Sequence, residues 1–62
     1  MFNTIQAERY VSETVSGAMT GTAFVNRKYT DCFVISVPFS LEGERFQMDV
    51  WEDENGRLYG EW

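Results

Sequence analysis

Two segments of alternating polarity, "CFVISVPFS" (residues 32–40) and "RFQMDVW" (residues 45–51), constrain this chain more than any other feature. Every second residue in each segment is apolar, which is typical of a strand with one buried face. Phe39 shares this face, and the residues that we expect in the core under a helix are Phe33, Ile35, Val37, Phe46, Met48 and Val50. A four-residue loop over residues 41–44, with Gly43 at positive φ, would bring the two segments into register. The resulting pairs are Phe39 with Phe46, Val37 with Met48, and Ile35 with Val50.

The tail "DVWEDENGRLYGEW" (residues 49–62) predicts one more strand after a turn. A one-residue slip in pairing moves every side chain to the opposite face, so the turn decides the outcome. A two-residue Asn55-Gly56 turn would place Glu61 opposite Val50, beside the core. A three-residue loop, Glu54-Asn55-Gly56, with Gly56 as a left-handed bulge residue, avoids this. It keeps Leu58 and Trp62 on the core face. We expect that register, which pairs Glu52 with Leu58, Val50 with Gly60, and Met48 with Trp62.

The N-terminal segment, residues 3–21, predicts a helix. Asn3 is a suitable N-cap with Gln6 three residues later, and Gly17 or Gly21 is expected to end the helix. The apolar residues that fall on one side at helical spacing are Ala7, Val11, Val15, Ala18 and Met19. Many β-branched residues lower the helix propensity of the segment, so the helix depends on packing against the strands.

"TAFVNRKY" (residues 22–29) predicts a short additional strand. Proline cannot donate a ladder hydrogen bond, so the first strand is expected to end near Gly21, before it reaches Pro38. Residues 1–62 are therefore predicted to form a single α+β domain, with one N-terminal helix packed on a three- or four-stranded antiparallel β-meander.

The chain has no histidine and one cysteine, Cys32, which we interpret as a small apolar filler. Without histidine, the commonest general base and metal ligand are missing, so we expect no enzyme activity, no metal and no cofactor. "WEDENG" resembles a calcium loop, but the alignment puts Trp51 and Trp62 where the first and twelfth ligands belong. No signal peptide or membrane span is indicated, and the expected location is the cytoplasm.

The net charge of −5 is concentrated in the last third of the chain, and we expect the two acidic turns to gather this charge toward one part of the surface. Residues 1–41 contain three acidic and three basic side chains, whereas residues 42–62 contain seven acidic side chains and two arginines. In the preferred register, Asp49 lies opposite Glu61 on the face away from the core, and like charges in this position destabilise a sheet. Accordingly, we expect Asp49→Asn and Glu61→Gln to hold or raise the melting temperature. We therefore interpret the acidic and aromatic residues as candidates for binding a partner: Glu42, Glu44, Asp49, Trp51, Glu52, Asp53, Glu54, Tyr59 and Glu61.

Two other interpretations of these residues remain open. Acidic turns can simply keep a small protein soluble and discourage edge pairing, and Trp51 and Tyr59 can stack across strands without any function. Aromatic sheet faces also bind nucleic acids, but those faces carry positive charge. Direct binding to nucleic acid is therefore not expected.

A small, acidic chain without catalytic residues, with its carboxylates gathered in "DVWEDENGRLYGEW", resembles the small inhibitors of phages and mobile elements, especially anti-CRISPR proteins that act as DNA mimics. These inhibitors share no common motif or fold, so no residue role is transferred. The resemblance implies a non-enzymatic inhibitor in a bacterial host. Its partner would be a basic nucleic-acid-handling protein, such as a subunit of a CRISPR effector complex.

The alternative is a structural or adaptor module that pairs an edge strand with a larger subunit or with a second copy of itself. In that case the acidity only confers solubility. The expected oligomeric state is a monomer or a weak homodimer, and elution at low and high salt would distinguish the two functions.

Overall fold

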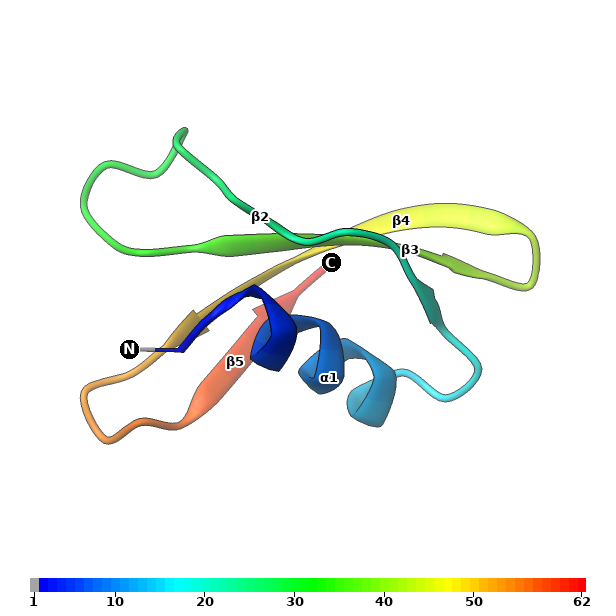
Figure 1. Ribbon diagram of the computed structural model, residues 1–62, viewed down its shortest axis with the longest axis horizontal. Coiled ribbons are helices and arrows are strands. Elements are labelled where there is room, and N and C mark those ends of the chain that lie inside the picture. Colours follow the sequence, from blue (N-terminus) through cyan, green and yellow to red (C-terminus); the bar gives the residue numbers. More distant parts are fainter. Residues whose placement is uncertain (1) are drawn as a thin grey trace.

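Helix α1 spans Thr4–Thr14 in the computed structural model of the protein, which describes residues 2–62 (Figure 1). Its first turn is fixed by a capping box: the Asn3 side chain accepts from the Gln6 N–H, and the Gln6 side chain accepts from the Asn3 N–H, both at 2.9 Å. These bonds satisfy two N–H groups that a helix start leaves without partners. The predicted N-cap is therefore confirmed.

The helix ends just before Gly17, the earlier of the two predicted end points, and does not reach Gly21. Val15 is already in an extended conformation, and Gly17 follows at φ 85°, in the left-handed region that glycine adopts without a steric penalty. Ala7 and Val11 are buried within the helix and Val15 is buried directly after it. The helical assignment of Ala18 and Met19 was wrong, since both lie beyond the helix end and Met19 is 73% exposed.

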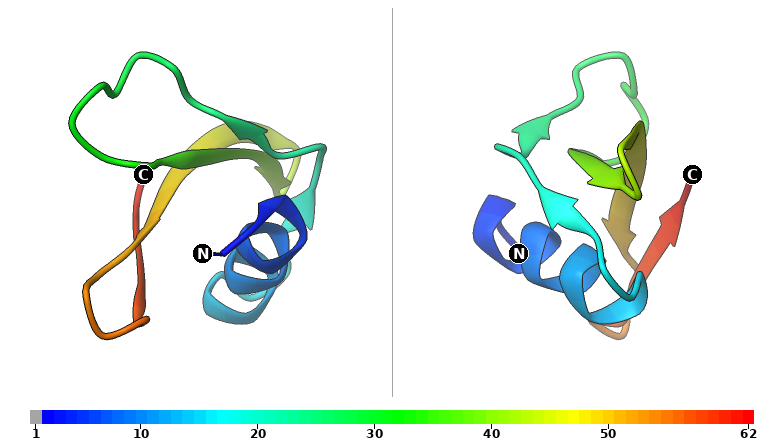
Figure 2. Two further views of the ribbon diagram at one scale, coloured as in Figure 1. Left: turned by 60° about the vertical axis from the view of Figure 1, so that its left-hand side comes forward. Right: turned by 90° about the vertical axis from the view of Figure 1, so that its right-hand side faces the viewer.

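Within residues 2–62, five strands form one antiparallel sheet, which confirms the α+β class. They are β1 (Met19–Thr20), β2 (Phe24–Val25), β3 (Ile35–Leu41), β4 (Glu44–Glu52) and β5 (Leu58–Glu61). The order across the sheet is β1-β3-β4-β5, and β2 pairs with β3 on the same side as β1. Helix α1 and the loop of residues 26–34, called the 26–34 loop below, lie on opposite sides of β3 and β4 (Figure 2).

Pro38 explains why the first position in the sheet is divided between β1 and β2. The Gly21 N–H donates to the Pro38 carbonyl at 2.7 Å, so the nitrogen of Pro38, which has no hydrogen, faces the same neighbour. The ladder breaks at this point, with Thr20 opposite Phe39 before the break and Phe24 opposite Ser36 after it. The expected interruption near Gly21 is therefore present, but pairing resumes beyond it.

The β3–β4 hairpin has the predicted register. Phe39 lies opposite Phe46, Val37 opposite Met48, and Ile35 opposite Val50. The ladder continues to Leu41 and Glu44, so the predicted four-residue loop was wrong and the turn contains only Glu42 and Gly43. Both have positive φ, at 51° and 83°, as a type I′ turn requires, and that turn matches the twist of the strands.

The core lies between α1 and the helix-facing side of the sheet. Val11, Ile35, Val37 and Val50 are fully buried. Burying each such side chain stabilises the fold by about 1.5 to 3 kcal/mol relative to leaving it exposed. Other core members are Phe2, Ala7, Val15, Ala23, Phe39 and Met48, and Phe46 packs against them while partly buried.

Phe33 was wrongly predicted to lie in the core. It precedes β3 and remains 37% exposed, because it sits at the end of the sheet with its ring packed edge-on against Phe2. The two ring centroids are 5.7 Å apart. The alternating pattern in the sequence therefore begins two residues before the regular strand.

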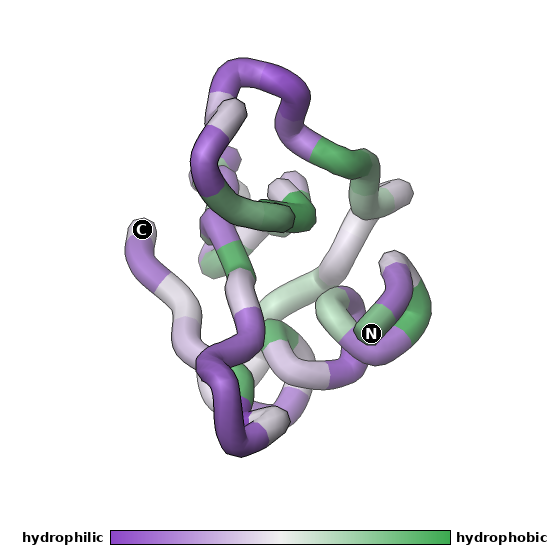
Figure 3. The backbone as a smooth tube through the Cα atoms, turned by 90° about the vertical axis from the view of Figure 1, so that its left-hand side faces the viewer, coloured by the Kyte–Doolittle hydropathy of each residue, from purple (hydrophilic) through white to green (hydrophobic). Residues whose placement is uncertain are grey.

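Trp62 lies on the helix-facing side of the sheet, as the chosen register required. Its ring packs edge-on against Phe39 and Phe46, with centroid separations of 5.1 and 5.2 Å. The side chain is nevertheless 58% exposed. Figure 3 shows hydrophilic backbone segments at opposite ends of the molecule, in the 26–34 loop and in the turn between β4 and β5.

Candidate functional site

The sheet face that points away from α1, called the outer face below, carries the acidic and aromatic pairs that the sequence predicted. Asp49 in β4 lies opposite Glu61 in β5, and Trp51 lies opposite Tyr59. The Trp51 and Tyr59 rings are stacked, with centroids 6.2 Å apart and planes inclined by 21°. The three-residue loop register is therefore confirmed.

The turn between β4 and β5 places these pairs in register. Gly56 adopts φ 83°, and its N–H donates to the Asp53 carbonyl at 3.1 Å. The Asp53 N–H in turn donates to the Arg57 carbonyl at 2.9 Å and closes the turn. Glu52 then lies opposite Leu58 and Val50 opposite Gly60, the two pairs expected from this loop length.

The 26–34 loop covers part of the outer face, a feature that the sequence did not indicate. The Tyr29 phenol donates to Asp49 Oδ2 at 2.7 Å, and the Ser36 hydroxyl donates to Asp49 Oδ1 at 2.7 Å. Ser36 in turn accepts from the Asn26 side-chain amide at 2.8 Å. Gln47 completes the set with a longer bond of 3.3 Å to Asp49 Oδ1. Asp49 therefore joins the loop to the middle of the sheet.

These bonds determine the protonation behaviour of both acidic groups in the contact. Partial burial of Asp49 opposes its ionisation, but the hydrogen bonds from Ser36, Tyr29 and Gln47 outweigh burial and lower the pKa of Asp49. The same bond and the nearby Asp49 charge raise the pKa of Tyr29, because the phenolate form would lose the bond and face a carboxylate. Asp49 is thus ionised and Tyr29 protonated at neutral pH.

The hydrogen bonds to Asp49 change the interpretation of its position opposite Glu61. From the sequence, this opposition offered a small domain no structural gain. The carboxylate instead accepts three side-chain hydrogen bonds, and each bond to a charged acceptor stabilises more than a neutral one. Asp49 consequently has a structural role, and Glu61 is the member of the pair that takes no part in this network among residues 2–62.

A cleft of about 440 Å³ lies on the outer face beside the 26–34 loop. Its walls combine aromatic, aliphatic, thiol and carboxylate groups, contributed by Tyr29, Cys32, Val34, Asp49, Trp51 and Glu61. Three of these residues were predicted for partner binding, whereas the three from the loop were not. The available signal was Ser36, a small polar residue in an apolar strand and opposite Asp49 in the expected register.

Cys32 does not fill the core as expected. It is exposed and lies in the cleft wall, because the loop carries it away from the helix-facing side of the sheet. Val34, by contrast, is 3% exposed even though it lies outside the core cluster. Val34 therefore gives the cleft a buried aliphatic group beside the exposed thiol of Cys32.

The remaining predicted residues are divided between the two ends of β4. Glu42 and Glu44 lie at the β3–β4 turn, whereas Glu52, Asp53 and Glu54 lie at the turn after β4. A nine-residue strand spans roughly 27 Å, so the expectation that both groups share one part of the surface was wrong. Of the predicted residues, Asp49, Trp51, Tyr59 and Glu61 share the outer face, and Asp53 interacts with Tyr59 from the adjoining turn.

Asp53 has a local structural role in its turn. Its Oδ1 accepts from the backbone N–H of Arg57 at 2.8 Å and of Asn55 at 2.9 Å. The bond from Arg57 is the main reason that the pKa of Asp53 is lowered. Desolvation opposes this effect, and the bonds from Asn55 and the Tyr59 hydroxyl lower the pKa further by smaller amounts. The turn therefore depends on the ionised carboxylate.

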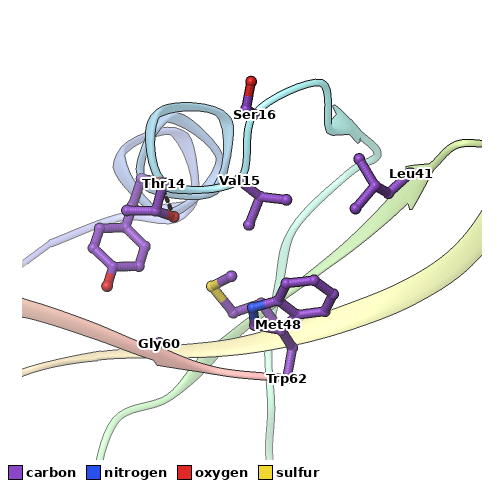
Figure 4. A pocket seen from close by; sticks show the side chains of 8 residues that line it. Thr14, Val15, Ser16, Leu41, Met48, Gly60 and Trp62 are labelled. Carbon is purple, nitrogen blue, oxygen red and sulfur yellow. Dashed lines mark hydrogen bonds between the residues drawn. The ribbon is translucent and has the colours of Figure 1, made fainter.

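A second depression, of about 370 Å³, lies on the other side of the sheet, between the end of α1 and β5. Figure 4 shows Val15 pointing toward Met48 and Trp62, with Leu41 at the far side. Gly60 forms part of its wall. A Cβ at Gly60 would overlap Met48 and approach a Tyr10 ring carbon to 2.9 Å, so the absence of a side chain there leaves room for both neighbours. The depression is lined mainly by apolar groups and lacks the paired carboxylates of the outer face.

Comparison with protein-family models, with curated proteins and with solved structures gave no significant match. Within residues 2–62, no three His, Cys, Asp or Glu side chains are grouped so that they could hold a metal ion. The helix in the same range is too short and too polar to cross a membrane. The charged and aromatic pairs of the outer face are therefore the features that bear on function.

Proposed function

We propose that this protein is a non-enzymatic inhibitor that binds a basic, nucleic-acid-binding groove of a partner protein through its outer face. The observation that carries this proposal is the pairing of Asp49 and Glu61 beside the stacked rings of Trp51 and Tyr59. Carboxylates on adjacent strands offer a fixed array of negative charge to lysine and arginine side chains that otherwise receive phosphates. The anti-CRISPR DNA mimics that the sequence resembles use this mode of inhibition.

Three physical features support a binding role for this face. Asp49 is held by hydrogen bonds, so little conformational entropy is lost when a partner contacts its carboxylate. Tyr59 remains 40% exposed, and aromatic side chains are frequent anchors in protein interfaces. The excess of seven acidic residues over two arginines in residues 42–62 would attract a basic partner over distances up to the Debye length.

A capture experiment with two matched variants tests the proposal. Glu61→Gln removes one charge from the outer face, and Glu13→Gln removes one charge from the exposed surface of α1. The immobilised wild-type protein and both variants are incubated with bacterial lysate, and bound proteins are eluted with a DNA or RNA oligonucleotide. We expect nucleic acid to elute a basic protein from the wild type and from Glu13→Gln, with reduced capture by Glu61→Gln. Equal capture by all three proteins, or elution by salt but never by nucleic acid, contradicts inhibition by charge mimicry.

The adaptor function remains the second candidate, and the exposed edge at β1 and β2 favours it. Met19, Phe24 and Val25 are 73%, 46% and 39% exposed along this edge. Pairing through such an edge buries apolar surface and adds main-chain hydrogen bonds, and neither effect depends strongly on salt. A homodimer that persists equally at low and high salt in analytical ultracentrifugation would favour this function over charge mimicry.

A further inference from the structure

We propose that the cleft beside the 26–34 loop binds an arginine side chain of the protein partner, an inference that rests on the proposed function and identifies the group recognised. At about 440 Å³, the cleft lies toward the lower end of the range for ligand pockets. That size accommodates one long side chain. The partner would insert this residue while the surrounding outer face contacts the rest of its basic groove.

The charge of the cleft selects a cation. Asp49 and Glu61 are the carboxylates in its wall. Among residues 2–62 no basic side chain lines the cleft, and Lys28, whose charge acts on Asp49, lies outside the lining. The hydrogen bonds to Asp49 consume most of its acceptor capacity: Oδ1 receives Ser36 and Gln47, and Oδ2 receives Tyr29. Glu61 is therefore the carboxylate available to accept hydrogen bonds from a ligand, while Asp49 contributes fixed negative charge.

The aromatic wall favours arginine over lysine. A guanidinium is planar, weakly hydrated and able to stack on an aromatic face while its N–H groups donate to a carboxylate, whereas an ammonium is compact and strongly hydrated. Trp51 and Tyr29 provide the rings, and Val34 provides an apolar floor for the methylene groups. The cleft thus matches each part of the arginine side chain with a group of suitable chemistry.

The two tryptophans allow an internally controlled test. Trp51 lines the cleft, whereas Trp62 packs on Phe39 on the opposite side of the sheet. The wild-type protein, labelled with ¹⁵N, is titrated with the capped peptide Gly-Arg-Gly and followed through the two indole N–H signals. We expect a saturable shift of the Trp51 signal and no saturable shift of the Trp62 signal. Equal responses of the two tryptophans, or none at Trp51, would overturn the inference.

Chemically matched ligands identify the group that is bound. Gly-Lys-Gly has the same charge as the arginine peptide, Gly-citrulline-Gly has nearly its shape without charge, and spermidine is a free polyamine. We expect the arginine peptide to bind about five to ten times more tightly than the lysine peptide, with no binding of citrulline. Citrulline binding as tight as arginine, lysine binding as tight as arginine, or spermidine binding tighter than arginine would each overturn the assignment to a partner arginine.

Two charge variants complete the test. Glu61→Gln should weaken arginine-peptide binding about five- to tenfold, whereas Glu13→Gln, with the same net charge, should leave it unchanged. Equal weakening in the two variants would show a nonspecific charge effect and overturn the inference. The two proposals can fail separately. If the arginine peptide does not bind but nucleic acid still displaces a captured basic protein, only this inference is rejected. If the peptide binds but nucleic acid displaces no captured protein, only the inhibitor function is rejected.

Discussion

The phenol of Tyr29 donates a 2.7 Å hydrogen bond to Asp49, a residue 20 positions later in the sequence. This contact joins the 26–34 loop to the outer face, because Asp49 lies in the middle of β4. The loop is also closed at its base, where the Asn26 N–H donates to the Val34 carbonyl at 2.8 Å. The shape of the cleft thus depends on the Tyr29 contact and on the two hydrogen bonds that Asn26 donates at the loop base, to Val34 and to Ser36.

Replacing Tyr29 with phenylalanine should loosen the loop without unfolding the protein. The Tyr29 ring is 40% exposed, so the change removes a hydrogen bond and little buried surface. We expect several-fold faster amide hydrogen exchange at Asn26 and an unchanged rate at Val11 in the core. Tyr59→Phe, a phenol removal elsewhere on the outer face, is the control. The role assigned to Tyr29 is wrong if both variants exchange at the wild-type rate.

Asp49→Asn and Glu61→Gln should change stability in opposite directions. Asp49→Asn weakens charge-assisted hydrogen bonds and should lower the free energy of unfolding by about 1 kcal/mol. This value is below the range for buried charged groups because Asp49 is only partly buried. Glu61→Gln removes the facing charge and should maintain or raise the melting temperature. From the sequence alone, both variants were expected to be at least as stable as the parent. Urea unfolding of both proteins would decide between these expectations.

The stability difference between wild type and Asp49→Asn should depend on pH. The pKa of Asp49 is lowered from its usual 3.8, so its ionised form stabilises the folded state fully at neutral pH. This stabilisation is lost as the pH falls below 3.8 and through the folded-state pKa. Asp53 titrates in the same direction in both proteins and cancels from the comparison. Unfolding measured between pH 7 and pH 2.5 should therefore show the two curves converging under acidic conditions, and a constant separation would contradict the role of the Asp49 charge.

Tyr29 produces the opposite dependence at alkaline pH. Its pKa is raised above the usual 10.0, so the protonated phenol stabilises the folded state below that value and the contribution is lost as the pH rises through the folded-state pKa. The difference in stability between wild type and Tyr29→Phe should accordingly disappear above pH 10.0, and amide exchange at Asn26 should become equal in the two proteins when intrinsic rates are taken into account. A difference that persisted unchanged there would exclude the phenol hydrogen bond as its cause.

The two hairpin registers were predictable because they depend on local information. Alternation in β3 and β4 specified which residues share a face, and avoiding Glu61 opposite Val50 selected the loop at Gly56. The length of the β3–β4 turn was not predicted, because Glu42 adopts a positive φ that its side chain does not favour. Favourable strand pairing up to Leu41 and Glu44 outweighs that local cost.

The cleft could not be predicted from the sequence because the 26–34 loop has no periodicity. Its contacts join residues distant along the chain, such as Asn26 with Ser36 and Tyr29 with Asp49. Such contacts depend on the path of the loop and on the face of β3 that it crosses. Counting charges along the sequence also placed Glu42 near the other acidic residues. Such a count contains no information on the length of β4, which separates the two turns.

Gly60 lies in β5 where the side chains of Met48 and of Tyr10 in α1 come close to the backbone. A Cβ at this position would overlap Met48 and lie 2.9 Å from the Tyr10 ring, so these two side chains must shift to admit a larger residue. Gly60→Ala should lower the free energy of unfolding by about 1 to 3 kcal/mol, the usual cost of overpacking. Met48→Ala removes the main obstacle, and the double variant should lose less stability than the sum of the two single changes. Additive losses in a urea-unfolding cycle would show that Gly60 is required for some reason other than this contact.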